Sequence, residues 1–467
     1  MELFQMSATA LLEAYRGGGA SPLEAMRSVL DRVARFEPHI SATYRLSPER
    51  ALAEAKASEE RWRRGQPIGP LDGVPATVKD NIATKGDPVP IGTAASDMAP
   101  AAADAPPAAR LREAGAILFS KTTMPDYGML SSGLSSLHKL ARNPWNLARN
   151  PGGSSAGAGA AAAASYGPLH VGTDIGGSIR LPAGWCGLVG FKPSGGRVPI
   201  DPSYYGRVAG PLTRTVEDAA LMMATLTKPD ARDYSSLPWR TLDWRVKPLD
   251  WRGRRVGLLV EAGCGDKPTP TVKREIERAA RDIAAAGAVV EPLAPFLTQE
   301  MLDGLDRFWR MRSLIDLNAL PPETRAKVLP FIRVWAEAAK GVDGETVFGG
   351  FNQMREMARA TVAATLPYDF VISPTAPDVA YPAEWAMPSN DPDNAMAHIG
   401  FTVAYNMSEQ PAATINCGYD HDGLPIGLQI VGRRFDDLGV LSAATAFEAM
   451  RAGEARPWPE PPNQDQD

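Results

Sequence analysis

Residues 152–180, GGSSAGAGAAAAASYGPLHVGTDIGGSIR, hold the pattern from which the fold and the chemistry of this chain are predicted. Two glycine–serine segments, 151–157 and 172–180, flank a stretch at 156–164 that is almost wholly Ala and Gly. Side chains this small let backbones approach closely, so the stretch predicts a buried helix whose N-terminus points at a site. A tightly packed helix that is simply capped by Ser154 or Ser155 is the alternative.

The second segment presents consecutive backbone N–H groups on a loop that can fold sharply, Ile175-Gly176-Gly177-Ser178. Successive N–H groups of this kind form a nest that holds an anion, which is the geometry an oxyanion hole needs. We expect a helical turn from Ile179, and a serine at the end of the nest would lie beside the carbonyl group it attacks. An ordinary glycine turn is the alternative interpretation.

A serine nucleophile needs a base, because its hydroxyl is a weak nucleophile at neutral pH. The candidate base is Lys79, which closes a short apolar strand predicted at 73–78. A free lysine has a pKa of about 10.4, so burial beside Val74 and Val78 is needed to lower this pKa until the neutral amine is populated near neutral pH. A solvated lysine at the end of a strand is the alternative.

The composition excludes several classes of protein. Of the 467 residues, 44% are hydrophobic and 22% are charged, as in globular proteins with a sizeable core. The 49 basic and 54 acidic residues give a net charge of −5, which argues against a nucleic-acid partner bound through a basic face. Three distant cysteines fit neither a disulfide framework nor a zinc module, and no signal-peptide or membrane-spanning pattern is evident. We therefore expect a cytoplasmic protein without a membrane partner.

The order of apolar patterns along the chain predicts an α/β protein. Residues 7–65 are expected to be helical, and short apolar runs then alternate with helical stretches, which indicates helices packed on a mixed or parallel sheet. Later strands are expected at 255–260, 289–293, 370–373 and 428–431. Residues 297–366 are expected to be mostly helical, with aromatic residues that belong more to the core than to a pocket: Phe308, Trp309, Phe331 and Trp335.

Two familiar motifs are rejected on their context. Residues 157–162 match the dinucleotide fingerprint G-x-G-x-x-A, but no apolar strand precedes them, and Asp174 is expected in a loop instead of at a strand end. Residues 153–157 match the G-x-S-x-G elbow of α/β-hydrolases, which also requires a strand before the serine.

The remaining motifs resemble those of the amidase signature hydrolases, which include fatty-acid amide hydrolase, bacterial aryl acylamidases and the A subunit of glutamyl-tRNA amidotransferase. The resemblance extends over about residues 7–450. The motifs that carry it are G-V-P-x-x-V-K-D-N at 73–81, 104–115 with Lys121-Thr122, Asn143-Pro144-Trp145, 152–155, 172–193, 369–374 and 423–429.

The resemblance implies the amidase signature fold, a large twisted mixed β-sheet with α-helices on both faces. It implies a single domain over residues 1–467, with N-terminal helices at 7–65 and a catalytic core at 66–225. The variable helical region 297–366 is expected over the substrate channel. The tail, 454–467, is Pro-rich and polar and is expected to be flexible.

The resemblance also implies a Ser–cis-Ser–Lys triad with Ser178 as nucleophile, Ser154 as bridging serine and Lys79 as base. The Gly153–Ser154 peptide bond is then expected to be cis. The backbone amides expected to bind the oxyanion are those of Ile175, Gly176, Gly177 and Ser178. The residues expected to support the site are Ser155, Asp174 and Arg180. The residues expected near the acyl pocket, without any charge, are Gly128, Met129, Leu130 and Ser131.

The function expected is hydrolysis of neutral amides, anilides or carbamates through an acyl-enzyme, with urethanase or esterase side activity. No metal or cofactor is implied, because no histidine cluster occurs and the acyl transfer needs none. The partner expected is a small-molecule substrate, and the protein is expected to be a monomer or homodimer. A glutaminase component of a tRNA amidotransferase and a non-catalytic homologue are the alternatives.

Overall fold

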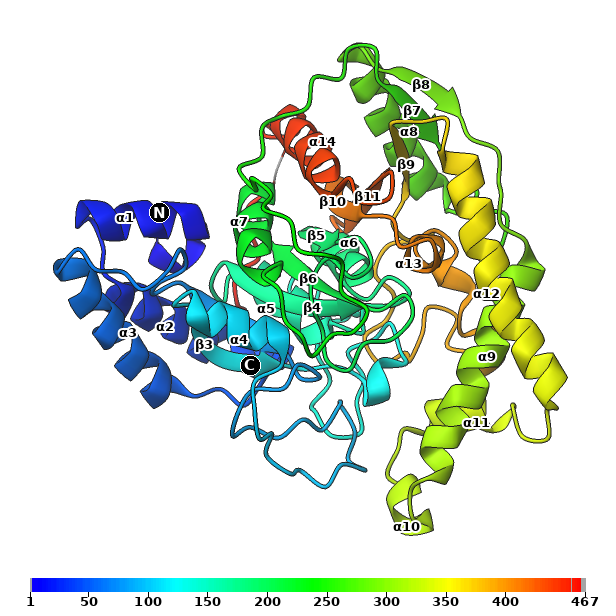
Figure 1. The fold of residues 1–467 in the computed structure, drawn as a ribbon, viewed down its shortest axis with the longest axis horizontal. Coiled ribbons are helices and arrows are strands. Elements are labelled where there is room, and N and C mark those ends of the chain that lie inside the picture. Colours follow the sequence, from blue (N-terminus) through cyan, green and yellow to red (C-terminus); the bar gives the residue numbers. More distant parts are fainter. Residues whose placement is uncertain (1, 455, 463–467) are drawn as a thin grey trace.

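The computed structural model describes residues 2–454 and 456–462. Its centre is one mixed sheet of 11 strands in the order β1-β3-β2-β4-β6-β5-β10-β11-β9-β7-β8 (Figure 1). The strands are β1 (Thr43–Tyr44), β2 (Pro75–Lys79), β3 (Ile117–Thr122), β4 (Leu169–Asp174), β5 (Val189–Lys192), β6 (Val208–Thr213), β7 (Arg255–Leu258), β8 (Val289–Pro292), β9 (Phe370–Pro374), β10 (Ala412–Tyr419) and β11 (Pro425–Gly432).

The helices lie on both faces of the sheet, as the sequence predicted (Figure 1). The α-helices are α1 (Ala8–Gly17), α2 (Pro22–Ile40), α3 (Pro48–Arg63), α4 (Pro106–Glu113), α5 (Ala156–Ala163), α6 (Arg180–Cys186), α7 (Val216–Leu226), α8 (Pro270–Ala285), α9 (Gln299–Asn318), α10 (Pro322–Arg325), α11 (Pro330–Glu337), α12 (Gly344–Thr365), α13 (Val403–Met407) and α14 (Asp437–Met450). The short 3-10 helices are η1 (Leu3–Gln5), η2 (Asp126–Gly128), η3 (Pro392–Asn394) and η4 (Ala397–Ile399).

Alternation along the strands divides the core into two layers. Phe370 and Ile372 of β9 belong to the part of the core that also contains residues of α1, α4, α7, α8 and α14. Val371, between them, packs with α9, α11, α12 and α13 on the other face. Successive side chains of a strand point to opposite faces, so a fully buried strand requires apolar residues at every position.

Two parallel strand pairs bring the motif residues together. β2 pairs in parallel with β4, with Val78 opposite Val171. The carboxyl ends of these strands therefore meet at one edge of the sheet, where Lys79 ends β2 and Asp174 ends β4. The expectation that Asp174 lies in a loop is wrong, because its strand contains a glycine and polar residues that hide the apolar pattern.

The helix α5 confirms the prediction from its small side chains, since all its residues are buried. A Cβ atom on Gly157 would lie 2.2 Å from the carbonyl oxygen of Ala42 and 2.4 Å from the amide nitrogen of Thr123. Only glycine allows this approach. Ser155 occupies the N-cap position, but its side chain makes no capping hydrogen bond, so simple helix capping does not account for the serine.

Residues near the end of the chain, for which a flexible tail is predicted, make contacts with the body of the protein. Arg456 lies over the ring of Tyr419, and Trp458 packs against Trp145 with ring centroids 6.0 Å apart. The buried Arg32 forms an ion pair with Glu460. These aromatic and ionic contacts connect residues 456–460 to the body of the protein, and the flexibility of the tail stays a prediction. Residues 455 and 463–467 of the predicted tail lie outside the described residues.

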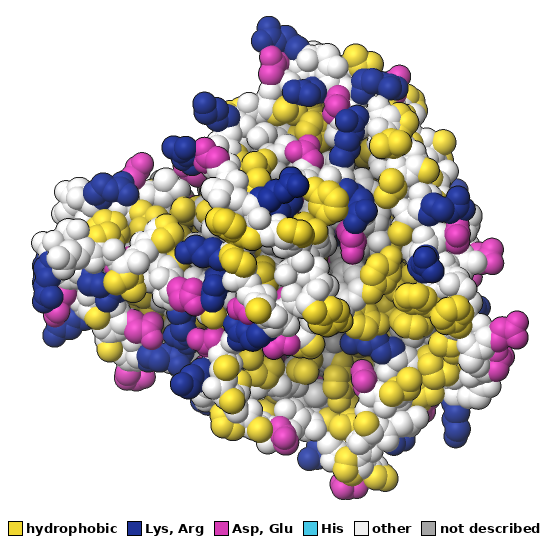
Figure 2. All heavy atoms as spheres, in the orientation of Figure 1, with side chains coloured by type: hydrophobic (Ala, Val, Ile, Leu, Met, Phe, Trp, Pro, Cys, Tyr) yellow, Lys and Arg dark blue, Asp and Glu magenta, His cyan; other side chains and the backbone are white. Residues whose placement is uncertain are grey.

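The surface shows no single-sign charged face in the view of Figure 2, where basic and acidic side chains are interspersed. Apolar side chains gather on the part of this face that contains α9 and α12 (Figure 2). Among the described residues, no helix is both long enough and apolar enough to cross a membrane. All three cysteines are buried and free.

The contrast between two glycines gives a test of the buried helix. We expect Gly157→Ala to destabilise the protein by about 1–3 kcal/mol or more, because backbone atoms on both sides would have to move. Gly349→Ala on the exposed part of α12 meets no atom within 4 Å, and should stabilise the protein by about 0.5–1 kcal/mol. Urea denaturation measures both, and equal effects would contradict the assignment of α5 as a close-packed helix.

Candidate active site

Lys79 lies at the centre of the site, fully buried at the carboxyl end of β2. Its Nζ atom donates hydrogen bonds to Ser154 Oγ at 2.8 Å and to Thr173 Oγ1 at 3.1 Å. Asn81 Nδ2 also donates to Thr173 Oγ1, at 3.1 Å. The alternative of a solvated lysine is thereby excluded.

Burial lowers the pKa of Lys79 well below its ordinary value of 10.5. The charge of Arg207 lowers it further, whereas the carboxylates of Asp174 and Asp80 oppose the shift. Removing an ammonium group from water disfavours its charged form, and the nearby hydroxyls compensate only in part. The neutral amine, which can accept a proton, is therefore favoured relative to a lysine in water.

Ser154 comes from the loop that precedes α5, and not from a strand, so the rejection of the hydrolase elbow is confirmed. The Gly153–Ser154 peptide bond is cis, as the resemblance implied. Gly128 lies against this serine, since a Cβ atom there would be 3.2 Å from Ser154 Oγ. The site residues at 128–131 therefore approach the loop that carries Ser154.

Ser155 links the two glycine–serine segments. Its hydroxyl donates to the carbonyl oxygen of Thr173 at 3.2 Å and accepts from the amide of the same residue at 3.3 Å. Its own amide donates to the carbonyl oxygen of Ser178 at 3.2 Å. These contacts fix the end of β4 and the residue Ser178 relative to the N-terminus of α5.

The loop before Ser178 is held by the buried pair Asp174–Arg180. Arg180 donates to Asp174 in a bidentate arrangement, with Nη2–Oδ1 at 2.9 Å and Nε–Oδ2 at 3.0 Å. The guanidinium also donates to side-chain oxygens of α13 and β11: Asn406 Oδ1 at 2.6 Å and Gln429 Oε1 at 2.7 Å. Burial alone would raise the pKa of Asp174, but the charge and hydrogen bonds of Arg180 bring it below its ordinary value.

The four amides expected to bind an oxyanion are not equivalent. The amide of Gly177 donates to Asp174 Oδ1 at 2.8 Å, so this arrangement does not leave it free. The carbonyl of Gly176 accepts a hydrogen bond from Thr402 Oγ1 at 2.6 Å. Within residues 2–454 and 456–462, the amides of Ile175, Gly176 and Ser178 have no acceptor. The expectation that the amide of Gly177 binds the oxyanion is therefore wrong, because this amide already donates to the carboxylate of Asp174. The sequence does not show that the two groups are in contact.

Ser178 opens onto a narrow cavity, called here the Ser178 cavity. It contains all four predicted pocket residues, Gly128, Met129, Leu130 and Ser131. The remaining lining comes from the nest, from α9 and from the segment before α13: Ile175, Gly176, Trp309, Arg312, Met387, Met396 and Ile399.

Two residues of α9, Trp309 and Arg312, line the Ser178 cavity, and the sequence analysis assigned neither of them to the site. Trp309 lies in the core as expected, at 6% exposed, and it also lines the Ser178 cavity. Arg312 brings a cation to a pocket that residues 128–131 leave uncharged, and its guanidinium lies over the ring of Tyr204 at 4.2 Å. A polar–apolar pattern on one helix does not reveal which turn faces a cavity, so no sequence signal identified these residues.

Thr173, Asn406 and Gln429 were also not identified from the sequence, although their side chains contact Lys79, Asp174 or Arg180. Thr173 precedes Asp174 and lies in the motif at 172–180, so its position in this motif could have indicated that it belongs to the site. Asn406 and Gln429 come from distant elements. Their roles depend on the packing of α13 and β11 against α6.

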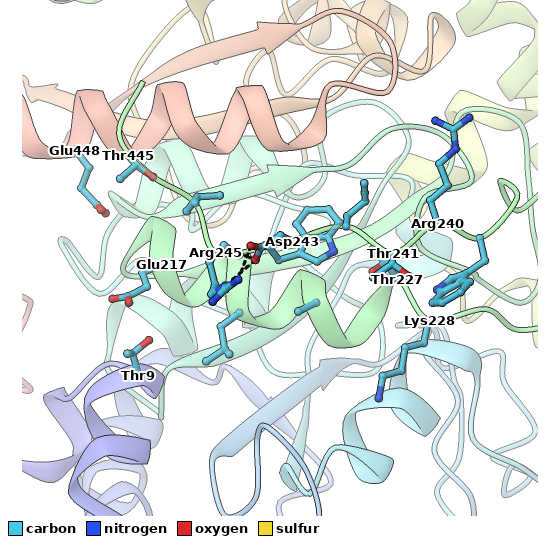
Figure 3. A pocket seen from close by; sticks show the side chains of 17 residues that line it. Thr9, Glu217, Thr227, Lys228, Arg240, Thr241, Asp243, Arg245, Thr445 and Glu448 are labelled. Atoms are coloured by element: carbon cyan, nitrogen blue, oxygen red, sulfur yellow. Dashed lines mark hydrogen bonds and ion pairs between the residues drawn. The ribbon is translucent and has the colours of Figure 1, made fainter. Parts of the chain in front are cut away.

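A cavity larger than the Ser178 cavity lies away from this chemistry. It is bounded by α7, α14 and the connection 227–246, with Glu217, Glu448 and Thr9 at one end and Arg240 and Lys228 at the other (Figure 3). The exposed turn between β10 and β11 brings Asp420, His421 and Asp422 within 4.8 Å of one another. Neither feature contains Lys79, Ser154 or Ser178.

Comparison with known proteins agrees with this arrangement of motifs. The family profile described as Amidase matches residues 24–441. The chain belongs to the amidase signature family. The A subunit of glutamyl-tRNA(Gln) amidotransferase from Chloroflexus aggregans is 32% identical over 96% of this chain and 97% of that protein.

Solved structures of the same family share the fold over nearly the full length. A bacterial aryl acylamidase of the amidase signature family superposes with a TM-score of 0.88 and 29% identity, covering 95% of this chain and 96% of that one. The peptide amidase of Stenotrophomonas maltophilia gives a TM-score of 0.81 and 28% identity, covering 98% and 99%. Membership in this family implies amidase chemistry on carbon–nitrogen bonds.

The burial of Lys79 predicts the pH dependence of any reaction that uses it as a base. We expect kcat/KM for an acyl anilide to rise with pH and to reach half its maximum well below pH 10.5, because the neutral amine is populated early. Lys79→Met should lower kcat/KM about 10²–10⁴-fold and abolish this rise. A midpoint at the ordinary lysine value in the wild type would contradict the assignment.

The buried ion pair predicts strong coupling between its partners. Asp174→Asn should destabilise the protein by about 3–5 kcal/mol, because it leaves the Arg180 charge buried without its counter-ion. The double variant Asp174→Asn/Arg180→Met should lose less than the sum of the single variants. Thermal unfolding measures the cycle, with Asp243→Asn in the exposed Asp243–Arg245 pair as a control that leaves the midpoint unchanged. Additive losses at the buried pair would show that the contact carries no coupling.

Proposed function

We propose that this protein is a stand-alone serine amidohydrolase of neutral amides, anilides or carbamates, with Ser178 as its nucleophile. The observation that carries the proposal is the hydrogen bond between the buried Lys79 Nζ and Ser154 Oγ, placed on a loop tied to Ser178. A lysine held away from water beside a hydroxyl has the surroundings required of a base.

The proposed reaction starts with attack of Ser178 Oγ on the carbonyl carbon of the substrate. The proton of Ser178 passes to Ser154, whose own proton passes to Lys79, so one proton reaches the amine and Ser154 is unchanged overall. Return of this proton by the same route lets the substrate nitrogen leave as an amine, and Ser178 remains acylated. Water then attacks the acyl-enzyme, with Lys79 again accepting the proton through Ser154. When the bond between the acyl carbon and Ser178 Oγ breaks, this proton returns through Ser154 to Ser178 Oγ, and the acid is released.

The negative charge that develops on the carbonyl oxygen needs donors that are already in place. The amides of Gly176 and Ser178 meet this requirement, since no group of the described chain accepts from them. Asp174 and Arg180 act on the loop and do not contact the reacting atoms in this proposal. The site thus separates the groups that react from those that position them.

The lining of the Ser178 cavity supports an uncharged, partly apolar substrate. Met129, Leu130, Trp309 and the other apolar residues supply most of the surface, and the cavity is lined by no carboxylate of the described chain. A free amino acid such as glutamine would leave its ammonium group without a counter-charge, which is costly in a desolvated site. Arg312 can accommodate a carbonyl oxygen or a carboxylate at the end formed by α9.

A glutaminase that supplies ammonia to a tRNA amidotransferase is the second candidate. The identity of 32% to the A subunit of such an amidotransferase favours it, and Arg312 offers a partner for the carboxylate of glutamine. This candidate is placed second because no carboxylate among the described residues lines the cavity to pair with the ammonium group of glutamine. The two candidates share the acyl-transfer chemistry and differ in substrate.

A substrate panel tests the proposal. Purified protein is assayed with glutamine, a short aliphatic amide, an acyl anilide and an aryl carbamate, in parallel with labelling of Ser178 by a fluorophosphonate. We expect turnover of the anilide or carbamate, with both turnover and labelling abolished in Ser178→Ala. Turnover of glutamine alone would establish the second candidate. Absence of turnover and of labelling in the wild type would leave a non-catalytic homologue.

A further inference from the structure

The Ser178 cavity contains a second serine whose hydroxyl is held by a buried histidine. Ser131 lines this cavity together with Ser178. Its Oγ atom lies 2.7 Å from Nε2 of His398, and the two residues are 6% and 2% exposed. The reaction proposed above uses neither residue.

Ser131 is fixed on three sides. Its amide donates to the sulfur of Met387 at 3.3 Å, and its carbonyl oxygen accepts from the hydroxyl of Tyr381 at 2.6 Å. His398 is in turn stacked on Trp185, with ring centroids 6.4 Å apart and an angle of 27° between the planes. The hydroxyl therefore has little freedom to reorient when a substrate enters the cavity.

The partners of His398 determine which atom of the pair is the donor. Burial lowers the pKa of His398 to about 3, against the opposing effect of a hydrogen bond from the ring to the backbone of Ala395. A neutral imidazole has one N–H and one nitrogen with a free lone pair. In the tautomer that carries its proton on Nδ1, Nε2 accepts a hydrogen bond from the hydroxyl of Ser131. The oxygen of Ser131 then offers only lone pairs to the cavity.

Trp309 provides the complementary group in the same lining. Its indole nitrogen is buried and, across the described residues, makes no hydrogen bond. A buried N–H without an acceptor carries a cost that a ligand oxygen can remove. Trp309 thus adds a buried donor without a partner to the residues that line the cavity with Ser131.

We propose that Ser131, held by His398, is a specificity-determining residue that accepts a hydrogen bond from an N–H group in the acyl part of the substrate, and that Trp309 donates to the adjacent carbonyl. The inference rests on the proposed function and deepens it. The substrate class is an amide whose acyl part carries a second amide, as in an N-acylated amino-acid amide. The hydrogen bond positions the acyl chain and takes no part in proton transfer.

Two para-nitroanilides that differ in one group test the role of Ser131. Acetylglycine para-nitroanilide has an N–H where levulinic acid para-nitroanilide has a methylene of similar size. We expect the wild type to prefer the first substrate by about 2- to 10-fold in kcat/KM, as a single neutral hydrogen bond allows. Ser131→Ala should bring the ratio close to one, mainly through KM. Ser442→Ala on α14, which lies outside the lining of this cavity, is the matched control and should keep the wild-type ratio.

The histidine is tested by two replacements with different acceptors. His398→Phe keeps an aromatic ring beside Trp185 but removes the acceptor, so the freed hydroxyl can turn its proton to the cavity and the preference should be lost. His398→Gln keeps an oxygen that can accept and should retain part of the preference. A purely structural role would change the stability of both variants without changing the ratio. Ser131→Thr, which keeps the hydroxyl, serves if Ser131→Ala does not fold.

The donor is tested separately with Trp309→Phe. Both substrates retain the carbonyl group, so this variant should lower kcat/KM for both by a similar factor and keep their ratio. Butyric acid para-nitroanilide, which lacks that carbonyl, should lose less. Equal loss on all three substrates would overturn the role of Trp309.

Labelling of Ser178 by the fluorophosphonate distinguishes failure of the inference about Ser131 from failure of the proposed function. If Ser178 is labelled but the wild type shows no preference, or the preference survives in Ser131→Ala, the inference about Ser131 is overturned and the proposed function stands. If Ser178 is not labelled and no anilide is hydrolysed, the proposed function fails and the inference fails with it.

Discussion

The buried pair Asp174–Arg180 is the interaction on which the rest of the site depends. Both side chains are removed from water, and each satisfies the other in a bidentate arrangement. Asp174 also accepts from the amides of Gly177 and Ile179, at 2.8 and 3.1 Å, on both sides of Ser178. A buried charge needs its partners, so the end of β4, the start of α6 and the loop between them are held as one unit.

The same pair connects the site to the second half of the chain. Asn406 of α13 and Gln429 of β11 both contact the guanidinium of Arg180. Thr402 joins the same network through two hydrogen bonds. Its hydroxyl donates to the carbonyl oxygen of Gly176, and its own carbonyl oxygen accepts from the guanidinium of Arg180. Residues more than 200 positions apart therefore share one hydrogen-bond network, and the loop of Ser178 is rigid only when the whole sheet is assembled.

Burial has opposite consequences for the two kinds of ionisable group in this network. The charge of Arg180 keeps Asp174 ionised, whereas Lys79, whose Nζ lies against the hydroxyls of Ser154 and Thr173, shifts toward its neutral form. One strand end thus provides a fixed charge that orients the loop, and its neighbour provides an amine able to take a proton. His398 shows a third outcome, because burial lowers its pKa and favours a neutral ring that shares a hydrogen bond with Ser131.

The sequence by itself determined the elements that depend on local pattern and on recognisable motifs. The alanine–glycine stretch predicted α5, the apolar run at 370–373 predicted β9, and the motif residues Lys79, Ser154 and Ser178 were identified before any geometry. Tertiary structure alone decided which amides of 175–178 are free, that Asp174 ends a strand, and that the tail residues near Trp458 are packed. It also placed Trp309 and Arg312 in the lining of the Ser178 cavity, and His398 against Ser131. These outcomes depend on contacts between distant segments, which a local pattern does not encode.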